Sequence, residues 1–315
     1  MLNKIINLGE NFRTFWSEAK DCPYGVQEKL WNKYIESDEQ DFYDDIVFQK
    51  DDREDCREYS EKNRKKRLKL FFEKVPEIYT PMMQEFESFD HIIISQLEKF
   101  KNHFPDANFS DVSAYAVPSV MSFNGKGEIL NDKPVLAFGM DMIAYFVKNP
   151  KCLEGFHAVH DADILYSHEM FHVYHNKFLS ITKEKIKKEG KLSHLLWMEG
   201  LAVFASGVLN PNASIEAMLM DANLPKIAKP KIKSLSEKFL KVAGEKLHNL
   251  ENPQISGAWF DMSTLDNDIL IRGGYYLGFE VVSNIANKYQ LEELVRWDFD
   301  RIHTEVKAEL EKMIQ

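Results

Sequence analysis

The feature that most constrains this chain is a short motif, His168-Glu169-Met170-Phe171-His172, which has the pattern H-E-x-x-H. Residues four positions apart lie on one face of an α-helix, so both imidazoles can bind one metal ion. Glu169 lies between them, where its carboxylate can take a proton from a water molecule beside that ion. The motif therefore predicts a helix that supplies two metal ligands and a general base.

The residues around the motif favour a buried helix. Asp161 or Asp163 offers an N-cap oxygen just before Ile164, and no Gly or Pro interrupts the chain from there to Leu179. Apolar side chains and histidines recur at spacings of three and four, which predicts one stripe facing a core. The bare pattern also fits two helix histidines beside a solvated glutamate, because three fixed positions in five match by chance.

Three further histidines lie near the motif. His175 is one turn beyond His172, where it is either a third ligand, a hydrogen-bond donor behind the ligands or a core histidine. We expect one of the latter two roles. His157 and His160 precede the motif helix, and we expect them to be loop and surface histidines.

Glu199 is the best remaining candidate for a third ligand. It lies in the helical segment from Leu195 to Ser206, where the neighbouring side chains are apolar or small. A carboxylate buried in such surroundings costs several kcal/mol unless it is paired or binds a cation. The alternatives are a metal ion and a lysine or arginine partner. Because catalytic zinc takes three protein ligands and keeps one position open, we expect the metal.

The motif followed by Glu199-Gly200-Leu201-Ala202 resembles the gluzincin class of zinc metallopeptidases. Within that class, the chain is similar to bacterial zinc-dependent proteases whose function is little characterised. The resemblance covers about residues 110 to 290 and includes two further stretches, Asp111 to Gly139 with its Phe123-Asn124-Gly125, and Arg272 to Phe279. It implies one zinc ion with His168, His172 and Glu199 as ligands and Glu169 as base. The metzincin pattern is excluded, because Asn176-Lys177-Phe178-Leu179 stands where a glycine and a histidine would follow.

Two tyrosines are candidates for stabilising the transition state. Tyr275 and Tyr276 begin a predicted helix after Gly273-Gly274. A tyrosine hydroxyl can donate to the oxyanion of a tetrahedral intermediate, and Arg272 shares a helical face with Tyr276 at the i and i+4 positions. The alternative is that both tyrosines are amphipathic core residues.

The overall pattern predicts an α+β fold that is mainly helical. We expect an N-terminal helical region over residues 1–110 and a gluzincin-like catalytic domain over residues 111–315. Val112–Val117 and Val135–Gly139 read as two strands of a small antiparallel sheet, joined by a loop containing Asn124-Gly125 and Gly127. Pro118 ends the first run and suggests an edge strand, which either holds an extended peptide or touches no ligand.

Net charge, hydropathy and cysteine content limit the classes of binding partner and the cellular compartment that we expect. A net charge of −10 argues against nucleic acid or an anionic membrane as the main partner, and the basic run Lys62 to Lys69 is interpreted as a solvated helix face. No 18 consecutive residues are apolar, and the first residues lack the apolar core of a secretory signal, so we expect neither a transmembrane helix nor a signal peptide. Cys22, Cys56 and Cys152 fit reduced thiols in the cytoplasm, with signal-independent export left open.

The sequence therefore predicts a zinc metallopeptidase that hydrolyses peptide bonds in a peptide or protein. Two alternatives come from other classes: a metal-dependent hydrolase of esters or small amides, and a non-catalytic binding protein on a gluzincin fold. The sequence does not indicate the cleavage-site preference or the oligomeric state.

Overall fold

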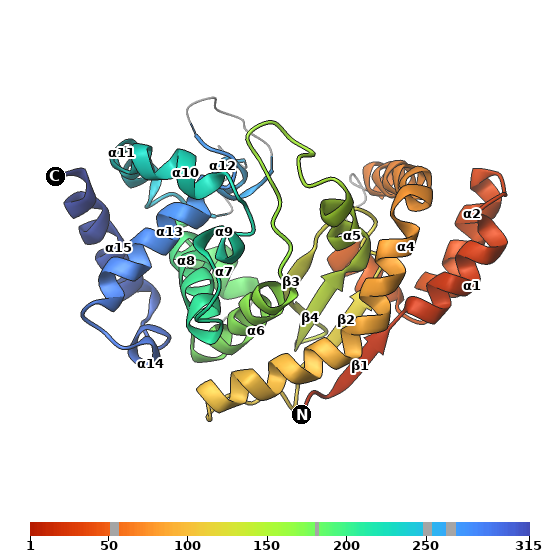
Figure 1. The fold of residues 1–315 in the computed structure, drawn as a ribbon, viewed down its shortest axis with the longest axis horizontal. Helices are drawn as coiled ribbons and strands as arrows, with labels where there is room; N and C mark the ends of the chain where they lie inside the picture. The colour runs from red at the N-terminus through yellow and green to blue at the C-terminus, as the bar shows by residue number, and fades with distance from the viewer. Residues whose placement is uncertain (51–56, 180–182, 248–253, 263–268) are drawn as a thin grey trace. The chain divides into compact units, whose positions relative to one another are not determined.

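The structure, a computed structural model, describes residues 1–50, 57–179, 183–247, 254–262 and 269–315. The chain forms two compact units, Met1–Asn149 and Pro150–Gln315 (Figure 1). This division differs from the one expected after residue 110. The reason is that a strand at the very start of the chain pairs with the strands beyond residue 110, so the sheet and the N-terminal helices belong to the same unit.

The N-terminal unit combines helices with a single sheet of four strands. Its elements in order are β1 (Lys4–Asn7), α1 (Gly9–Ala19), α2 (Tyr24–Trp31), the π-helix η1 (Asn32–Glu36), α3 (Gln40–Phe42), the π-helix η2 (Tyr43–Val47), α4 (Arg57–His103), β2 (Ser113–Val117), β3 (Gly125–Leu130), β4 (Lys133–Gly139) and α5 (Met140–Lys148).

The sheet has the strand order β1-β2-β4-β3 and is mixed. β2 is parallel to both β1 and β4, and only β3 and β4 are antiparallel. The expected antiparallel pairing of the two apolar strands is therefore wrong. The expected loop contains a third strand, β3, which carries the chain back, so β4 runs in the same direction as β2.

Two details of the expected sheet change with this topology. Gly125 and Gly127 lie within β3, not in a loop. Pro118 follows an inner strand, because β2 ends at Val117 between β1 and β4. A proline just beyond the last strand residue removes no ladder hydrogen bond, so it does not mark an edge. The edges are β1 and β3.

A buried aromatic cluster joins the helices of the N-terminal unit. The ring of Trp31 lies with its centroid 5.5 Å from those of Phe15 and Phe71, and 5.8 Å from that of Tyr43. All four side chains are fully buried. Helix α4 contributes a long stripe of such residues and contains Pro76 and Pro81; Figure 1 shows that it bends along its length.

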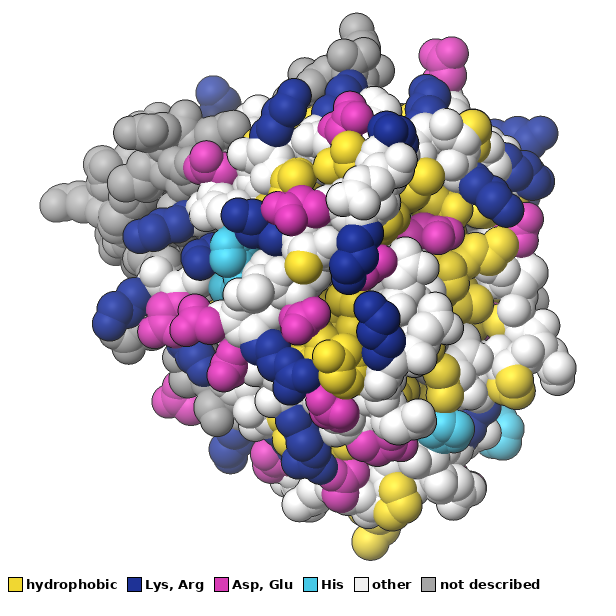
Figure 2. All heavy atoms as spheres, turned by 90° about the vertical axis from the view of Figure 1, so that its left-hand side faces the viewer, with side chains coloured by type: hydrophobic (Ala, Val, Ile, Leu, Met, Phe, Trp, Pro, Cys, Tyr) yellow, Lys and Arg dark blue, Asp and Glu magenta, His cyan; other side chains and the backbone are white. Residues whose placement is uncertain are grey.

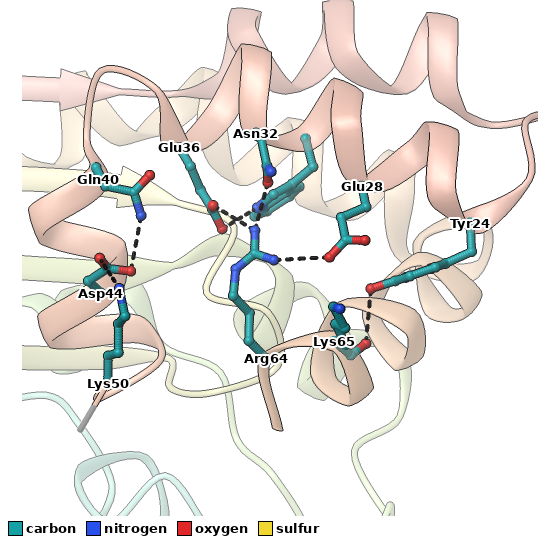
Figure 3. A network of polar contacts seen from close by, with 10 residues as sticks. Tyr24, Glu28, Asn32, Glu36, Gln40, Asp44, Lys50, Arg64 and Lys65 are labelled. Atoms are coloured by element: carbon teal, nitrogen blue, oxygen red, sulfur yellow. Dashed lines mark hydrogen bonds and ion pairs between the residues drawn. The ribbon is translucent and has the colours of Figure 1, made fainter. Parts of the chain in front are cut away.

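A polar network lies beside this cluster (Figure 3). The Arg64 guanidinium from α4 binds Glu28 at 3.1 Å and Glu36 at 2.7 Å. Trp31 donates its indole N–H to the other oxygen of Glu36 at 2.7 Å. Arg64 thus has a structural role, so the interpretation of Lys62 to Lys69 as a solvated helix face is wrong at this residue.

The C-terminal unit contains helices and two isolated β-bridges but no strand in the part of the chain that the structure describes. Its elements are α6 (Ala162–Leu179), α7 (Lys183–Glu189), α8 (Leu192–Leu209), α9 (Ile215–Met218), α10 (Leu224–Ala228), the 3₁₀-helix η3 (Lys229–Lys231), α11 (Ile232–Val242), α12 (Ile255–Phe260), α13 (Gly273–Ala286), α14 (Leu291–Leu294) and α15 (Phe299–Ile314). Together the two units confirm the expected fold class, which is mainly helical α+β.

Helix α8 is the apolar centre of the C-terminal unit. By length and composition it is the one helix among the described residues that could cross a membrane, yet 67% of that segment is buried inside the structure. Trp197 on α8 stacks on Trp297, with ring centroids 4.9 Å apart. Burial against protein is the property of a core helix, and a core helix passes the same length and hydropathy test.

The surface and the cysteines agree with the composition. On the face drawn in Figure 2, Lys and Arg side chains lie interspersed with Asp and Glu side chains. Cys22 and Cys152 are free thiols, and Cys56 lies outside the described residues.

Candidate metal centre

Helix α6 presents the two histidines of the motif. The backbone N–H of Ile164 donates to the Asp161 side chain at 3.2 Å, so Asp161, not Asp163, is the N-cap residue. The helix then runs unbroken to Leu179, as the sequence predicts. His168 and His172 are 3% and 9% exposed, and Glu169 is 7% exposed, so the alternative of two helix histidines beside a solvated glutamate is excluded.

The side chains of His168, His172 and Glu199 converge on one point. The two Nε2 atoms are 3.0 Å apart, and Glu199 Oε2 lies 3.3 Å from His168 Nε2 and 3.4 Å from His172 Nε2. Three ligand atoms held about 2.0–2.1 Å from one tetrahedral zinc ion are separated by about 3.3 Å. The donor set and its spacing therefore fit a metal ion, and among the described residues these three form a group that could hold one.

A close helix crossing lies directly beside Glu199. Gly200 on α8 lies directly against Gly278 on α13: a Cβ atom on Gly200 would meet the Gly278 carbonyl carbon at 2.3 Å, and one on Gly278 would meet the Leu196 oxygen at 2.5 Å. Only glycine permits this approach, because any side chain would push the two backbones apart. The backbones of α8 and α13 therefore approach closely at Gly200.

The charge on Glu199 is balanced by the histidines alone. Its ion-pair partners in the described structure are His168 and His172, so a lysine or arginine partner is excluded there. Burial opposes ionisation of Glu199, but the histidines outweigh it and hold the pKa of this carboxyl well below its ordinary value. Burial likewise opposes protonation of His172, yet Glu199 and Glu169 raise its pKa to about 9. Without a metal, a proton therefore neutralises the cluster.

Glu169 and Tyr275 lie beside this cluster, whereas Tyr276 does not. Glu169 is 7% exposed, and its charge acts on both His172 and Tyr275. The Tyr275 ring centroid is 6.5 Å from that of His168, and burial together with the Glu199 charge raises the pKa of its hydroxyl. Tyr276 is buried, and a hydrogen bond with Glu280 contributes to its own raised pKa. Of the two tyrosines, Tyr275 is the one at the cluster.

The other histidines lie outside the converging group. His175 is fully buried, neither ring nitrogen has a hydrogen-bond partner among the described residues, and burial lowers its pKa to about 3. It is therefore a neutral core histidine, not a third ligand. His157 is half-buried and His160 is exposed, in keeping with the expected loop and surface positions.

Two contacts at the site were not expected from the sequence. Asn210, at the end of α8, donates to Ser167 at 3.1 Å and so joins α8 to α6 next to His168. Arg272 places its guanidinium 4.5 Å from the ring centroid of Tyr275, not against Tyr276. In the sequence, an asparagine after an apolar helical segment indicates only a helix end. The spacing of Arg272 and Tyr276 indicates a contact with the other tyrosine.

In comparisons with known proteins, no protein-family model, no curated protein and no solved structure matches this chain. The function proposed below therefore rests on the geometry of the site and on the resemblance of the motifs to those of the gluzincin class.

Substituting Gly278 with alanine should disrupt the site without touching a ligand. The added methyl group would press on the α8 backbone, so we expect a loss of about 1–3 kcal/mol in unfolding free energy and weaker metal binding. Urea unfolding and zinc titration measure the two effects. Gly244→Ala is the matched control, since its nearest neighbour would be 3.9 Å away. Equal stability and zinc affinity in both variants would contradict the close crossing.

The metal-free protein should lose stability as the pH rises. The pKa of His172 is raised to about 9, so its protonated form stabilises the fold fully below about pH 6.5 and the effect disappears as pH rises through 9. Up to about 3 kcal/mol is at stake, and saturating zinc should remove the decline. Thermal unfolding between pH 6 and 10, with chelator or with zinc, measures this. Glu199→Gln should show a much weaker decline; an identical one would refute the pairing.

Proposed function

We propose that the protein is a zinc-dependent peptidase. One observation carries the proposal: His168 Nε2, His172 Nε2 and Glu199 Oε2 lie 3.0–3.4 Å from one another, with Glu169 on the same helix between the two histidines. This arrangement has the ligand set and base of the gluzincin class, which the motifs resemble.

Zinc suits this donor set better than the other common divalent ions. Two imidazole nitrogens and one carboxylate oxygen are typical ligands of catalytic zinc, whereas magnesium and calcium prefer oxygen ligands throughout. Three protein ligands leave a fourth position for water or substrate. A zinc ion held there would lower the pKa of a water molecule to about 7 and polarise a peptide carbonyl.

Glu169 would serve as the general base and then as the general acid. Its carboxylate takes the proton from the attacking water and passes it to the leaving amine when the C–N bond breaks. The nearly complete burial of Glu169 and the charges around it favour a proton shuttle that exchanges little with bulk water.

Tyr275 would stabilise the oxyanion. Its raised pKa keeps the hydroxyl protonated at neutral pH, so it can donate a hydrogen bond to the oxygen on which negative charge develops. The Arg272 guanidinium lies over the ring of Tyr275, 4.5 Å from its centroid.

The surface and the thiols support the remaining parts of the proposal. The net charge of −10 and the interspersed charges of Figure 2 favour a peptide or protein substrate over nucleic acid or an anionic membrane. Free Cys22 and Cys152 favour the cytoplasm, where thiols stay reduced.

Replacing Glu169 with Gln should separate chemistry from metal binding. We expect zinc content to stay near one ion per chain and peptide cleavage to fall by about 10³-fold, because the amide cannot accept the proton. Glu199→Ala should instead lower zinc content, because it removes a ligand. Metal analysis of the purified variants and cleavage of a peptide library, with and without a chelator, measure both effects.

The same survey decides between the candidate functions. Chelator-sensitive cleavage of peptides supports the proposal, and wild-type cleavage by Glu169→Gln would remove Glu169 from its role. Hydrolysis of esters or small amides alone would point to the wider hydrolase class. Zinc binding with no hydrolysis of any substrate would point to a binding protein.

Tyr275→Phe and Tyr276→Phe form a matched pair. Each removes one hydroxyl, but only Tyr275 lies beside His168. We expect Tyr275→Phe to lower kcat by about 10²-fold with little change in KM, and Tyr276→Phe to leave both nearly unchanged. Steady-state kinetics on the best library peptide measures this. Equal kcat values for the two variants would show that neither hydroxyl stabilises the oxyanion.

A further inference from the structure

Arg272 is a buried cation with no anionic partner in the described structure. The residue is 8% exposed, and its guanidinium carbon lies 4.5 Å from the ring centroid of Tyr275 and 6.0 Å from that of Phe156. Buried arginines are nearly always paired, since desolvating a charge costs several kcal/mol. Stacking uses the face of the guanidinium and leaves the N–H groups at its edge free to donate.

Other arginines in the described structure show the contrast. Arg64 binds Glu28 and Glu36, and Arg13 binds Glu87 at 2.9 Å. Arg301 also stacks on an aromatic ring, that of Trp297 at 4.2 Å, but it binds Glu293 at 3.0 Å as well. Arg67, which lies over the ring of Phe48, has no carboxylate partner in the described structure but donates to the carbonyls of Val47 at 2.8 Å and Ser119 at 3.4 Å. These stacked arginines thus also have a hydrogen-bond acceptor, whereas Arg272 has none for its guanidinium among the described residues.

The backbone holds Arg272 at the edge of the metal centre. It is the N-cap residue of α13, in the left-handed conformation with φ of 55°, which is uncommon for a residue other than glycine. Its carbonyl accepts the N–H of Tyr275 at 3.0 Å. Such conformations persist where surrounding structure enforces them, and they cluster at functional sites. Tyr275 contacts both the Arg272 guanidinium and the His168 ring, so one tyrosine links the cation to the cluster.

We propose that Arg272 binds a carboxylate of the peptide substrate and thereby selects which bond is presented to the metal centre. This rests on the proposed function, because it assigns a substrate feature to the same site. A planar guanidinium binds a carboxylate through two parallel N–H···O bonds, and each extended residue spans about 3.4 Å. The carboxylate therefore belongs to a residue close to the cleaved bond, either as the chain's C-terminus or as an acidic side chain.

Binding to a catalytically silent protein tests this without turnover. In the full chain with Glu169→Gln and zinc, calorimetry compares three probes: acetylated tetra-alanine with a free C-terminus, its C-terminal amide, and that amide with glutamate as the last residue. We expect one or both carboxylate probes to bind about 10- to 100-fold more tightly than the neutral amide. A preference for the free C-terminus identifies the chain end, and a preference for the glutamate amide identifies the side chain.

Variants of Arg272 then test whether this residue causes the preference for carboxylate probes. In the Glu169→Gln protein, a further Arg272→Gln substitution should reduce the ratio of the affinities for the carboxylate probe and the neutral amide to about one. Arg272→Lys should keep part of this ratio, and the control Arg301→Gln should keep it unchanged. Circular dichroism and zinc content confirm that each variant is folded and loaded. Equal or undetectable binding of all three probes, or a preference that survives Arg272→Gln, overturns the proposal. Carboxylate preference without peptide cleavage by the wild type would leave this site standing and remove the proposed function instead.

Discussion

The contact between Gly200 and Gly278 is the constraint on which the candidate site depends. It lets the backbones of α8 and α13 touch, which no pair of residues with side chains would permit. Glu199 precedes one glycine and Tyr275 lies one turn before the other, so a single crossing fixes both residues. With α6 packed against α8, the two ligands of the motif, the third ligand and the tyrosine come together. The chemistry is therefore positioned by helix packing rather than by loops.

The part of this arrangement that could be predicted is the part that local chemistry determines. Helix α6 is predictable because an aspartate N-cap precedes a segment that no Gly or Pro interrupts. Glu199 is predictable as a cation-binding residue because a lone carboxylate in an apolar helix needs a positive partner. In the structure α6 runs from Ala162 to Leu179, and Glu199 pairs with His168 and His172. The sheet was less predictable, because Gly125 and Gly127 resemble turn residues while the hydrogen bonds of β3 are made with β4. Strand direction depends on that distant pairing, and a single sequence carries little trace of it.

The pairing of Arg272 with Tyr275 shows a second limit of periodicity. Helical spacing predicted that Arg272 would share a face with Tyr276, four residues on. That rule applies only between residues with helical backbone angles, and Arg272 has φ of 55° just outside the first turn of α13. Its side chain accordingly leaves in another direction and meets Tyr275. A left-handed conformation at a residue other than glycine is rarely evident from sequence, because tertiary contacts enforce it.

Glu199, which is 16% exposed, and the buried Arg272 are two charges in one unit with different surroundings. Glu199 is neutralised within the protein, since two histidines surround its carboxylate and one of them gains a proton when no metal is present. A metal ion bound there would take the place of that proton. Arg272 has aromatic rings but no anion beside it in the described structure. Stacking on an aromatic ring is worth less than the cost of desolvating a charge, so a carboxylate bound to Arg272 would offset the remainder. One charge with partners beside one charge without an anionic partner is the arrangement from which the proposed carboxylate binding follows.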